Sequence, residues 1–354
     1  MTDLLAFTAE LVDMASVSHA EGPFVDWLEA ELRPVPWLTV DRVGDNLVAR
    51  TRLGRPWRVV LAGHTDTVPV NGNAQARIEG DTLWGLGSAD MKSGLAVMVA
   101  LARTIASPAI DVTYVFYAGE EVAAEHNGLG HLFRDRPDLV AGDVALLGEP
   151  TSAAIEAGCQ GTLRIAVTLA GARAHTARPW MGRNAIHRLG DVLRLVAELD
   201  SRHPVIDGCT YREALQAVRV DGGVAGNVVP DRATVTLNHR FAPDRTAEEA
   251  AGSVRSLLAP VLEEGDTFEL VDHAEGARPS LDHPVLAALI ARNRLSVEAK
   301  LGWTDVARFA AHGVPAANFG PGDATVAHSA DERVERGQIE ACFAALDDLL
   351  RIGP

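Results

Sequence analysis

The sequence has few cysteines, few lysines and no long apolar run, and each shortage limits what the protein can be. Its three cysteines, Cys159, Cys209 and Cys342, are widely spaced and form no CxxC pair, which excludes a disulfide framework and favours reduced thiols. No stretch of about 18 apolar residues is present, so we expect no membrane-spanning helix. Acidic residues interrupt the first fourteen positions, which argues against a signal peptide. We therefore expect a soluble, cytoplasmic protein.

Positive charge is also scarce. Lys92 and Lys300 are the only lysines, and 32 Lys and Arg residues face 48 Asp and Glu residues, for a net charge of −16. Proteins that bind nucleic acids or anionic membranes present a basic face, so we expect neither kind of partner. A small anionic substrate is compatible with this charge, because it needs only a few local cations. The length of 354 residues suggests two domains.

One apolar run leads directly into a histidine and an aspartate. Residues 58–69 read RVVLAGHTDTVP, and the run at residues 59–61 is typical of a strand buried on both faces. His64 and Asp66 follow at a spacing of two, so both side chains project to the same side if the backbone stays extended. Ligands in α/β sheets collect beyond the carboxyl ends of strands. The pair could therefore belong to a metal site, although a surface turn explains it about equally well.

Two further apolar runs end in acidic residues in the same way. Residues 112–117 lead to Glu120 and Glu121, and residues 143–147 lead to Glu149. Three strands would thus deliver an imidazole or carboxylates at their carboxyl ends, and we expect these side chains to face one crevice. This convergence is the strongest functional indication that the residues themselves provide.

Asp90 lies in a glycine-rich segment just ahead of a predicted helix. Residues 84–92 read WGLGSADMK, and the glycines allow a tight backbone path. An apolar stripe at helical spacing follows from Lys92 onward, so Asp90 could be a simple N-cap or a ligand. The segment lacks the GK[ST] ending of a nucleotide loop, which excludes that interpretation.

From about residue 162 the pattern changes to β-α-β-β-α-β. Strands are expected at residues 163–169, 213–220, 233–240 and 268–271, and helices at residues 184–199 and 246–262. This order predicts a small antiparallel sheet with two helices on one face. The predicted fold class is α/β, a central mixed sheet flanked by helices, with an inserted α+β two-layer domain. The predicted bounds are 1–161 and 273–354 for the catalytic domain and 162–272 for the insertion.

Two histidines and three carboxylates complete a plausible ligand set: His64, Asp90, Glu121, Glu149 and His328. Five such side chains suit two divalent ions that share a bridging carboxylate. Mixed nitrogen and oxygen ligation favours zinc, with cobalt or manganese as substitutes. Two ions roughly 3.5–4 Å apart can hold both oxygens of a hydrolysis and acidify water, so that a nearby carboxylate takes its proton at neutral pH. The spacing does not say which of the two adjacent glutamates binds metal.

The motifs resemble, in order along the whole chain, those of the co-catalytic zinc amidohydrolase and peptidase family. That family includes aminoacylase, acetylornithine deacetylase, carboxypeptidase G and succinyl-diaminopimelate desuccinylase. The matching segments are HTDTVP at 64–69, GLGSADMK at 85–92, the glutamate pair at 120–121, GEP at 148–150 and the late His328. The resemblance implies a zinc-peptidase-like catalytic domain and an amide hydrolase that uses two zinc ions.

The resemblance also implies a role for each candidate residue in the first domain. Asp90 would bridge the two ions, with His64 and Glu149 on one ion and Glu121 and His328 on the other. Asp66 would orient the His64 imidazole from behind, a contact that fixes the tautomer of a metal-bound histidine. Glu120 would be the general base and later the acid for the leaving amine.

For the inserted domain, the resemblance implies a homodimer. Residues 172–179 read ARAHTARP, and His175 would reach the partner's active site and stabilise the oxyanion; the alternative is a plain loop histidine. Asn227 and Arg240 resemble the substrate-binding pair, with the Arg240 fork gripping a carboxylate. Further candidates for substrate binding are Arg178, Thr304 and Arg308. The alternative for each of the two arginines is an ordinary ion pair on the surface.

Residues 302–309 and 318–323 resemble most the desuccinylases of lysine and diaminopimelate biosynthesis, in their actinobacterial form. This implies removal of succinate from N-succinyl-L,L-diaminopimelate. Gln160 departs from the arginine found at its position in the better-known desuccinylases. The alternatives are an acetylornithine deacetylase or a carboxypeptidase acting on other N-acyl amino acids. A scaffold protein without catalysis predicts loss of Glu120 or Asp66, and both are present.

Overall fold

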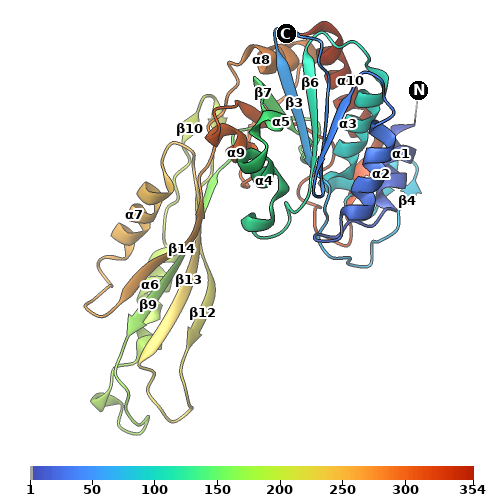
Figure 1. Cartoon of the computed structure of the whole chain (residues 1–354). Helices are drawn as coiled ribbons and strands as arrows, with labels where there is room; N and C mark the ends of the chain where they lie inside the picture. Colours follow the sequence, from blue (N-terminus) through green and yellow to red (C-terminus); the bar gives the residue numbers. More distant parts are fainter. Residues whose placement is uncertain (1–2) are drawn as a thin grey trace. The chain divides into compact units, whose positions relative to one another are not determined.

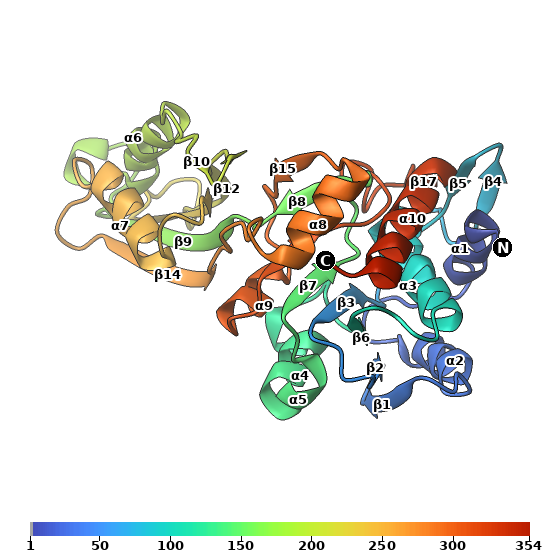
Figure 2. The ribbon, with the colours of Figure 1, turned by 90° about the horizontal axis from the view of Figure 1, so that it is seen from above.

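The computed structural model describes residues 3–354 and divides into two compact units (Figures 1 and 2). The first unit holds the chain up to Gly158 with residues 279–298 and 308–354, and the inserted unit holds residues 159–278 and 299–307. None of the helices in residues 3–354 combines the length and apolar composition that crossing a membrane requires.

An eight-stranded mixed sheet forms the centre of the first unit, in the order β1-β2-β6-β3-β7-β16-β8-β15. The pairs β3–β6, β3–β7 and β7–β16 are parallel, whereas β1–β2, β2–β6 and β8–β16 are antiparallel. The strands are β1 (Thr39–Val43), β2 (Asn46–Arg50), β3 (Arg58–His64), β6 (Asp111–Tyr117), β7 (Val144–Leu147), β8 (Ile155–Ala157), β15 (Val297–Ala299) and β16 (Ala316–Asn318).

Helices cover both faces of this sheet (Figures 1 and 2). Helix α3 packs on β3 and β6, and α1 and α10 pack against α3; α4 and α5 lie on the opposite side. The helices are α1 (Leu4–Val12), α2 (Gly22–Leu32), α3 (Ser93–Thr104), α4 (Gly128–Asp135), α5 (Pro137–Val140), α8 (Pro284–Asn293), α9 (Val306–Ala311) and α10 (Arg336–Ile352). Because both faces are covered, β6 is buried at every position, as its continuous apolar and β-branched pattern requires.

Short elements complete the first unit and lie next to the candidate site. A three-stranded sheet has the order β17-β5-β4, with β4 (Arg77–Glu79), β5 (Thr82–Trp84) and β17 (Arg333–Glu335). Two short helical turns, η1 (Ser88–Lys92) and η2 (Ala124–His126), also belong to this unit. The pairing of β5 with β17 brings the segment before Asp90 against the segment after His328.

The inserted unit is an antiparallel sheet in the order β12-β13-β9-β14 with two helices, as the β-α-β-β-α-β pattern predicts. Its elements are β9 (Gly161–Ala170), η3 (Pro179–Met181), α6 (Ala185–Ala197), β10 (Val205–Ile206), β11 (Cys209–Thr210), β12 (Ala214–Gly222), β13 (Arg232–Phe241), α7 (Ala247–Leu258) and β14 (Thr267–Ala274). Together with the mixed central sheet of the first unit, this arrangement confirms the predicted fold class.

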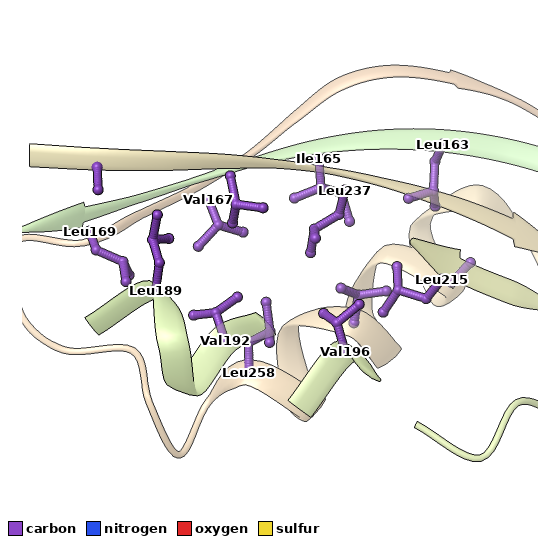
Figure 3. Packing of buried hydrophobic residues seen from close by; sticks show 14 of the residues in the cluster. Leu163, Ile165, Val167, Leu169, Leu189, Val192, Val196, Leu215, Leu237 and Leu258 are labelled. Carbon is purple, nitrogen blue, oxygen red and sulfur yellow. The ribbon is translucent and has the colours of Figure 1, made fainter. Parts of the chain in front are cut away.

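Apolar and more polar residues alternate along β9, and the apolar ones form part of the core of the inserted unit. Ile165 and Val167 are fully buried on the helix side, and they face Val192 of α6 and Leu258 of α7 (Figure 3). The residues that alternate with them on β9, such as Arg164 and Ala166, turn to the other face and are exposed or half-buried. Each fully buried aliphatic side chain of this kind contributes about 1.5–3 kcal/mol to folding.

The inserted unit consists of two segments of the chain, Cys159–Arg278 and Ala299–Ala307. Two contacts join this late segment to the start of the unit: the Gln160 amide donates to the Lys300 carbonyl at 3.2 Å, and the Cys159 thiol donates to the Thr304 carbonyl at 3.8 Å. The predicted segment 162–272 lies within these limits, and residues 299–307 join it only through contacts between segments that are far apart in sequence.

Candidate metal centre

Three parallel strands deliver the candidate ligands to one edge of the sheet. His64 is the last residue of β3, Glu120 and Glu121 follow β6, and Glu149 follows β7. β3 lies between β6 and β7 and is parallel to both, so the three carboxyl ends point the same way. Ligand atoms of His64, Asp90 and Glu121 all lie within 4.8 Å of one another.

Asp90 faces a different imidazole with each of its carboxylate oxygens. His64 Nε2 is 3.0 Å from Asp90 Oδ1, and His328 Nε2 is 3.5 Å from Asp90 Oδ2. His328 Nε2 is also 2.8 Å from Glu121 Oε1. Asp90 and Met91 have non-helical backbone angles within the turn Ser88–Lys92, so Asp90 lies before α3 and does not cap it.

The electrostatics of the cluster favour charged pairs when no metal is bound. Burial lowers the pKa of His64, but the hydrogen bond with Asp90 and the negative charges of Glu149 and Asp66 outweigh it, so the pKa lies well above its ordinary value. Hydrogen bonds with Asp90 and Glu121 raise the pKa of His328 to about 10. Burial raises the pKa of Asp90, yet its two imidazole partners hold it well below its ordinary value. A divalent cation would take the place of the imidazole protons.

Glu149 is buried, and a close contact between two main-chain segments brings it towards the cluster. A Cβ atom on Gly94, in the first turn of α3, would lie 2.3 Å from the Gly148 carbonyl oxygen. Only glycine allows this approach, so the segment after Asp90 can pack directly against the segment that carries Glu149.

Asp66 lies behind the cluster, where its carboxylate holds the glutamate pair. Asp66 Oδ1 accepts from the Glu120 amide at 3.0 Å, and Oδ2 accepts from the Glu121 amide at 3.0 Å and from the Ser18 hydroxyl at 2.8 Å. His64 Nδ1 is 3.0 Å from the main-chain oxygen of Asp66 and 3.6 Å from its carboxylate. The Asp66 main chain therefore makes the shorter contact with the imidazole, while its side chain orients Glu120 and Glu121.

His328 comes from a loop, whereas His64 ends a strand of the sheet. His328 lies well beyond β16 (Ala316–Asn318), with φ of 62°, in the left-handed region that non-glycine residues rarely adopt. Sequence reasoning also missed Glu332 and Ser18. Glu332 is 1% exposed, and its Oε1 accepts from the Ala89 and Asp90 amides, both at 3.0 Å. The only signal for it was a position four residues after His328.

Three of the remaining candidates lie together at one end of the inserted unit. The loop after β9 carries His175 and Arg178, and the β12–β13 loop carries Asn227; all three are exposed. A bridge between His175 and Val228 joins the loops, and the Thr176 amide donates to the Asn227 carbonyl at 3.0 Å. His175 Nδ1 accepts from the Ala177 amide at 3.0 Å, which fixes the ring within the loop.

Arg240 lies at the opposite end of the same sheet, paired in register with Thr162. Within residues 3–354 no hydrogen bond or ion pair holds its half-buried guanidinium, and burial lowers its pKa. Thr304 is also in the inserted unit and is buried, with a hydroxyl that has no partner among the described residues. Arg308 belongs to the first unit, beside Gly130.

Comparisons with known proteins identify the family of the chain. The model of peptidase family M20/M25/M40 matches residues 60–352. Over 350 residues, 99% of this chain and 97% of the relative, the chain is 51% identical to a Mycobacterium tuberculosis protein provisionally named succinyl-diaminopimelate desuccinylase DapE. It is 45% identical over 354 residues to the succinyl-diaminopimelate desuccinylase of Corynebacterium glutamicum, covering 98% of this chain and 96% of that one.

Solved structures show the same fold at low sequence identity. A tripeptidase from Staphylococcus aureus matches with a TM-score of 0.79 at 18% identity, over 99% of this chain and 97% of that one. A dinuclear metal-binding peptidase of the M20 family from Bacillus subtilis matches with a TM-score of 0.74 at 12% identity, over 98% and 96%. Because the family model and these relatives span most of the chain, the resemblance drawn from the motifs is confirmed, and the protein belongs to peptidase family M20/M25/M40.

Proposed function

We propose that the protein is a metal-dependent amide hydrolase that removes succinate from N-succinyl-L,L-diaminopimelate, a step of lysine and diaminopimelate biosynthesis. The M20 family is metal-dependent, and two relatives at 51% and 45% identity over nearly the whole chain bear the name of this activity. The observation that carries the proposal is the position of Asp90, whose two oxygens face His64 and His328 at 3.0 and 3.5 Å.

The donor set fits two divalent cations, which we propose to be zinc. Asp90 would bridge them, since each of its oxygens already faces a separate imidazole. His64 and Glu149 would complete one site, and Glu121 and His328 the other. Imidazole nitrogen mixed with carboxylate oxygen is the ligation that zinc accepts, with cobalt or manganese as substitutes. Bound zinc would supply Lewis-acid polarisation of the scissile carbonyl and would acidify the attacking water.

The protein's own groups then move the proton and orient the reacting atoms. Glu120 is half-buried beside the proposed ligand Glu121 and acts as general base, and it returns the proton to the leaving amine as general acid. Its backbone is fixed because its amide donates to the buried Asp66 carboxylate. Arg240, a half-buried cation without an internal partner among residues 3–354, binds a carboxylate of the substrate.

The register of the inserted sheet supports a homodimer with composite active sites. Arg232 of β13 pairs with Ala170 at the end that carries His175 and Asn227, whereas Arg240 pairs with Thr162 at the other end. Eight residues of strand separate Arg232 from Arg240, about 26 Å at 3.3 Å per residue. One chain therefore cannot bring His175 and its own Arg240 to the same substrate, but a loop from a second copy can supply His175.

Strand β12 offers a surface on which a second copy could pair. It is an edge strand of the sheet and is exposed along nearly all its length. Val218 and Val220 are 56% and 50% exposed. An exposed apolar edge strand is a template for pairing with another chain, and homodimers use such self-complementary edges.

Succinate release tests the proposed reaction. The zinc-loaded protein should release stoichiometric succinate from N-succinyl-L,L-diaminopimelate, and chelator-treated protein should not until zinc is added back. N-acetylornithine serves as the competing substrate, because it lacks the succinyl carboxylate. Faster hydrolysis of N-acetylornithine than of the succinyl substrate by fully loaded protein would replace desuccinylation with deacylation of other N-acyl amino acids.

Mixing two inactive variants tests the composite site. Glu120→Ala lacks the proposed base, and His175→Ala lacks the loop histidine, so each homodimer should be inactive. After subunit exchange, about half of the dimers are mixed, and each mixed dimer has one intact site in two. The mixture should therefore recover about a quarter of the wild-type activity. No recovery from mixed dimers isolated by two affinity tags would contradict the composite site.

A further inference from the structure

The segment that carries Asp90 is held by a buried carboxylate with no role in the ligand set. Glu332 is 1% exposed, and one of its oxygens accepts hydrogen bonds from two consecutive amides, Ala89 and Asp90, at 3.0 Å each. These amides precede α3 (Ser93–Thr104), so no helical turn supplies them with acceptors. Burial raises the pKa of Glu332, and the hydrogen bonds from these amides act against that shift. Two amides on one carboxylate oxygen fix the direction of the peptide plane from which the Asp90 side chain leaves.

The main chain of Glu332 binds the same segment a few residues earlier. Its carbonyl accepts from the Gly85 amide at 3.1 Å, and β17 then pairs with β5, Arg333 opposite Trp84. Glu332 therefore contacts the 85–90 segment at both ends, with its backbone at Gly85 and its side chain at Asp90. Because Glu332 follows His328 by four residues, the same short stretch of chain carries one proposed ligand and clamps another.

A buried lysine holds the far end of the segment. Lys92 is 2% exposed, and its amino group donates to two main-chain oxygens. One belongs to Leu11, in the last turn of α1, at 3.0 Å, and the other to Met14, just after that helix. Burial lowers the pKa of Lys92 to about 7, and the negative charges of Glu332 and Asp13 act against that shift. The turn that presents Asp90 is thus anchored on both sides by buried ionisable side chains, each of which is satisfied by main-chain hydrogen bonds.

We propose that Glu332 is a positioning residue of the metal centre, which fixes the Asp90 carboxylate through the Ala89 and Asp90 amides and couples its placement to that of His328. This inference rests on the proposed function, in which Asp90 bridges the two cations. Glu332 itself binds no metal and touches no substrate. Its removal should let the Asp90 peptide rotate, so that the carboxylate no longer faces both imidazoles, and the bridged pair of cations should bind less tightly.

Metal affinity, measured without reference to turnover, tests this role. Metal-free protein is titrated with Co²⁺, and binding is followed by visible absorption and by competition with a chelator. Loss of a partner that orients a ligand typically weakens metal binding about 10- to 100-fold. We expect a weakening near the upper value for Glu332→Ala. For Glu332→Gln we expect one near the lower value, because Gln keeps an oxygen acceptor without its charge. Both should change the Co²⁺ absorption bands, which report ligand geometry.

Glu335→Gln is the matched control. Glu335 is exposed and lies on β17, which begins directly after Glu332. Within residues 3–354 its carboxylate accepts from the Thr82 hydroxyl, at 2.9 and 3.0 Å, and makes no contact with the Asp90 segment, so its loss should leave the affinity and the absorption bands unchanged. Circular dichroism identifies which of the two Glu332 variants is folded, and one folded variant is enough for the comparison with the wild-type protein. Wild-type affinity and bands in a folded variant, even one with lowered thermal stability, would reduce Glu332 to a structural role and overturn the proposal. If the wild-type protein itself binds no metal pair, the proposed function fails first, which is a distinguishable result.

Discussion

When metal binds again to the metal-free protein, it should release protons, and the number should equal the number of protonated imidazoles that become ligands. Without metal, both His64 and His328 have raised pKa values, about 10 for His328, so both are protonated near neutral pH. An imidazole binds metal only in its neutral form. The Asp90 pKa is lowered, so its carboxylate is already ionised and contributes no proton. We therefore expect about two protons released per chain when two cations bind at about pH 7.5.

The apparent metal affinity should therefore rise with pH. Each displaced proton makes the apparent affinity rise about tenfold per pH unit, so the two together give about 100-fold for the pair of sites, until the pH passes the pKa values of the imidazoles. The metal-free protein should show the opposite trend in stability. A histidine whose folded pKa is raised stabilises the fold below its unfolded pKa of about 6.5, and this contribution is lost as the pH rises through about 10 for His328.

Calorimetry in buffers of different ionisation enthalpy measures the proton count. The slope of the observed binding enthalpy against the buffer enthalpy should give two protons for the wild-type protein and one for His328→Asn. His203→Asn, a histidine outside the cluster, should leave the slope unchanged. A slope of zero for the wild-type protein, or an unchanged slope in His328→Asn, would refute the assignment of the two imidazoles as ligands.

Three further predictions concern the carboxylate behind the site, the loop of the inserted unit and its core. Asp66→Asn places an amide donor against the amides of Glu120 and Glu121, so kcat/KM should fall about 10- to 100-fold with unchanged far-ultraviolet circular dichroism. His175→Ala should keep both metals but lose an oxyanion donor worth about 3 kcal/mol, and retained turnover at normal metal content would end that assignment. Leu237→Ala empties a fully buried position of the inserted core and should cost about 2–5 kcal/mol in urea unfolding of that unit, with wild-type Co²⁺ affinity in the folded protein.

The sequence was sufficient to identify the central strands that present polar residues at their ends. Residues 59–61, 112–117 and 143–147 were recognisable as buried strands because continuous apolar runs have few other uses in a chain of this composition, and they became β3, β6 and β7. The β-α-β-β-α-β order of the inserted unit was equally readable, because alternation along a strand such as β9 and the helical spacing in α6 are local patterns. Both conclusions depend only on residues close to one another in sequence.

The tertiary structure decided what no local pattern encodes. The sequence pointed to Asp66 as a partner for His64, but only the fold shows that its carboxylate accepts the Glu120 and Glu121 amides, some 54 residues away. It also revealed that Glu332 is buried against the Asp90 peptide, since the pairing of β17 with β5 joins segments about 250 residues apart. A glutamate in a polar turn has the same appearance in sequence whether it is solvated or enclosed. Its role follows from which distant backbone amides the fold places beside it, because hydrogen bonds form between neighbours in space.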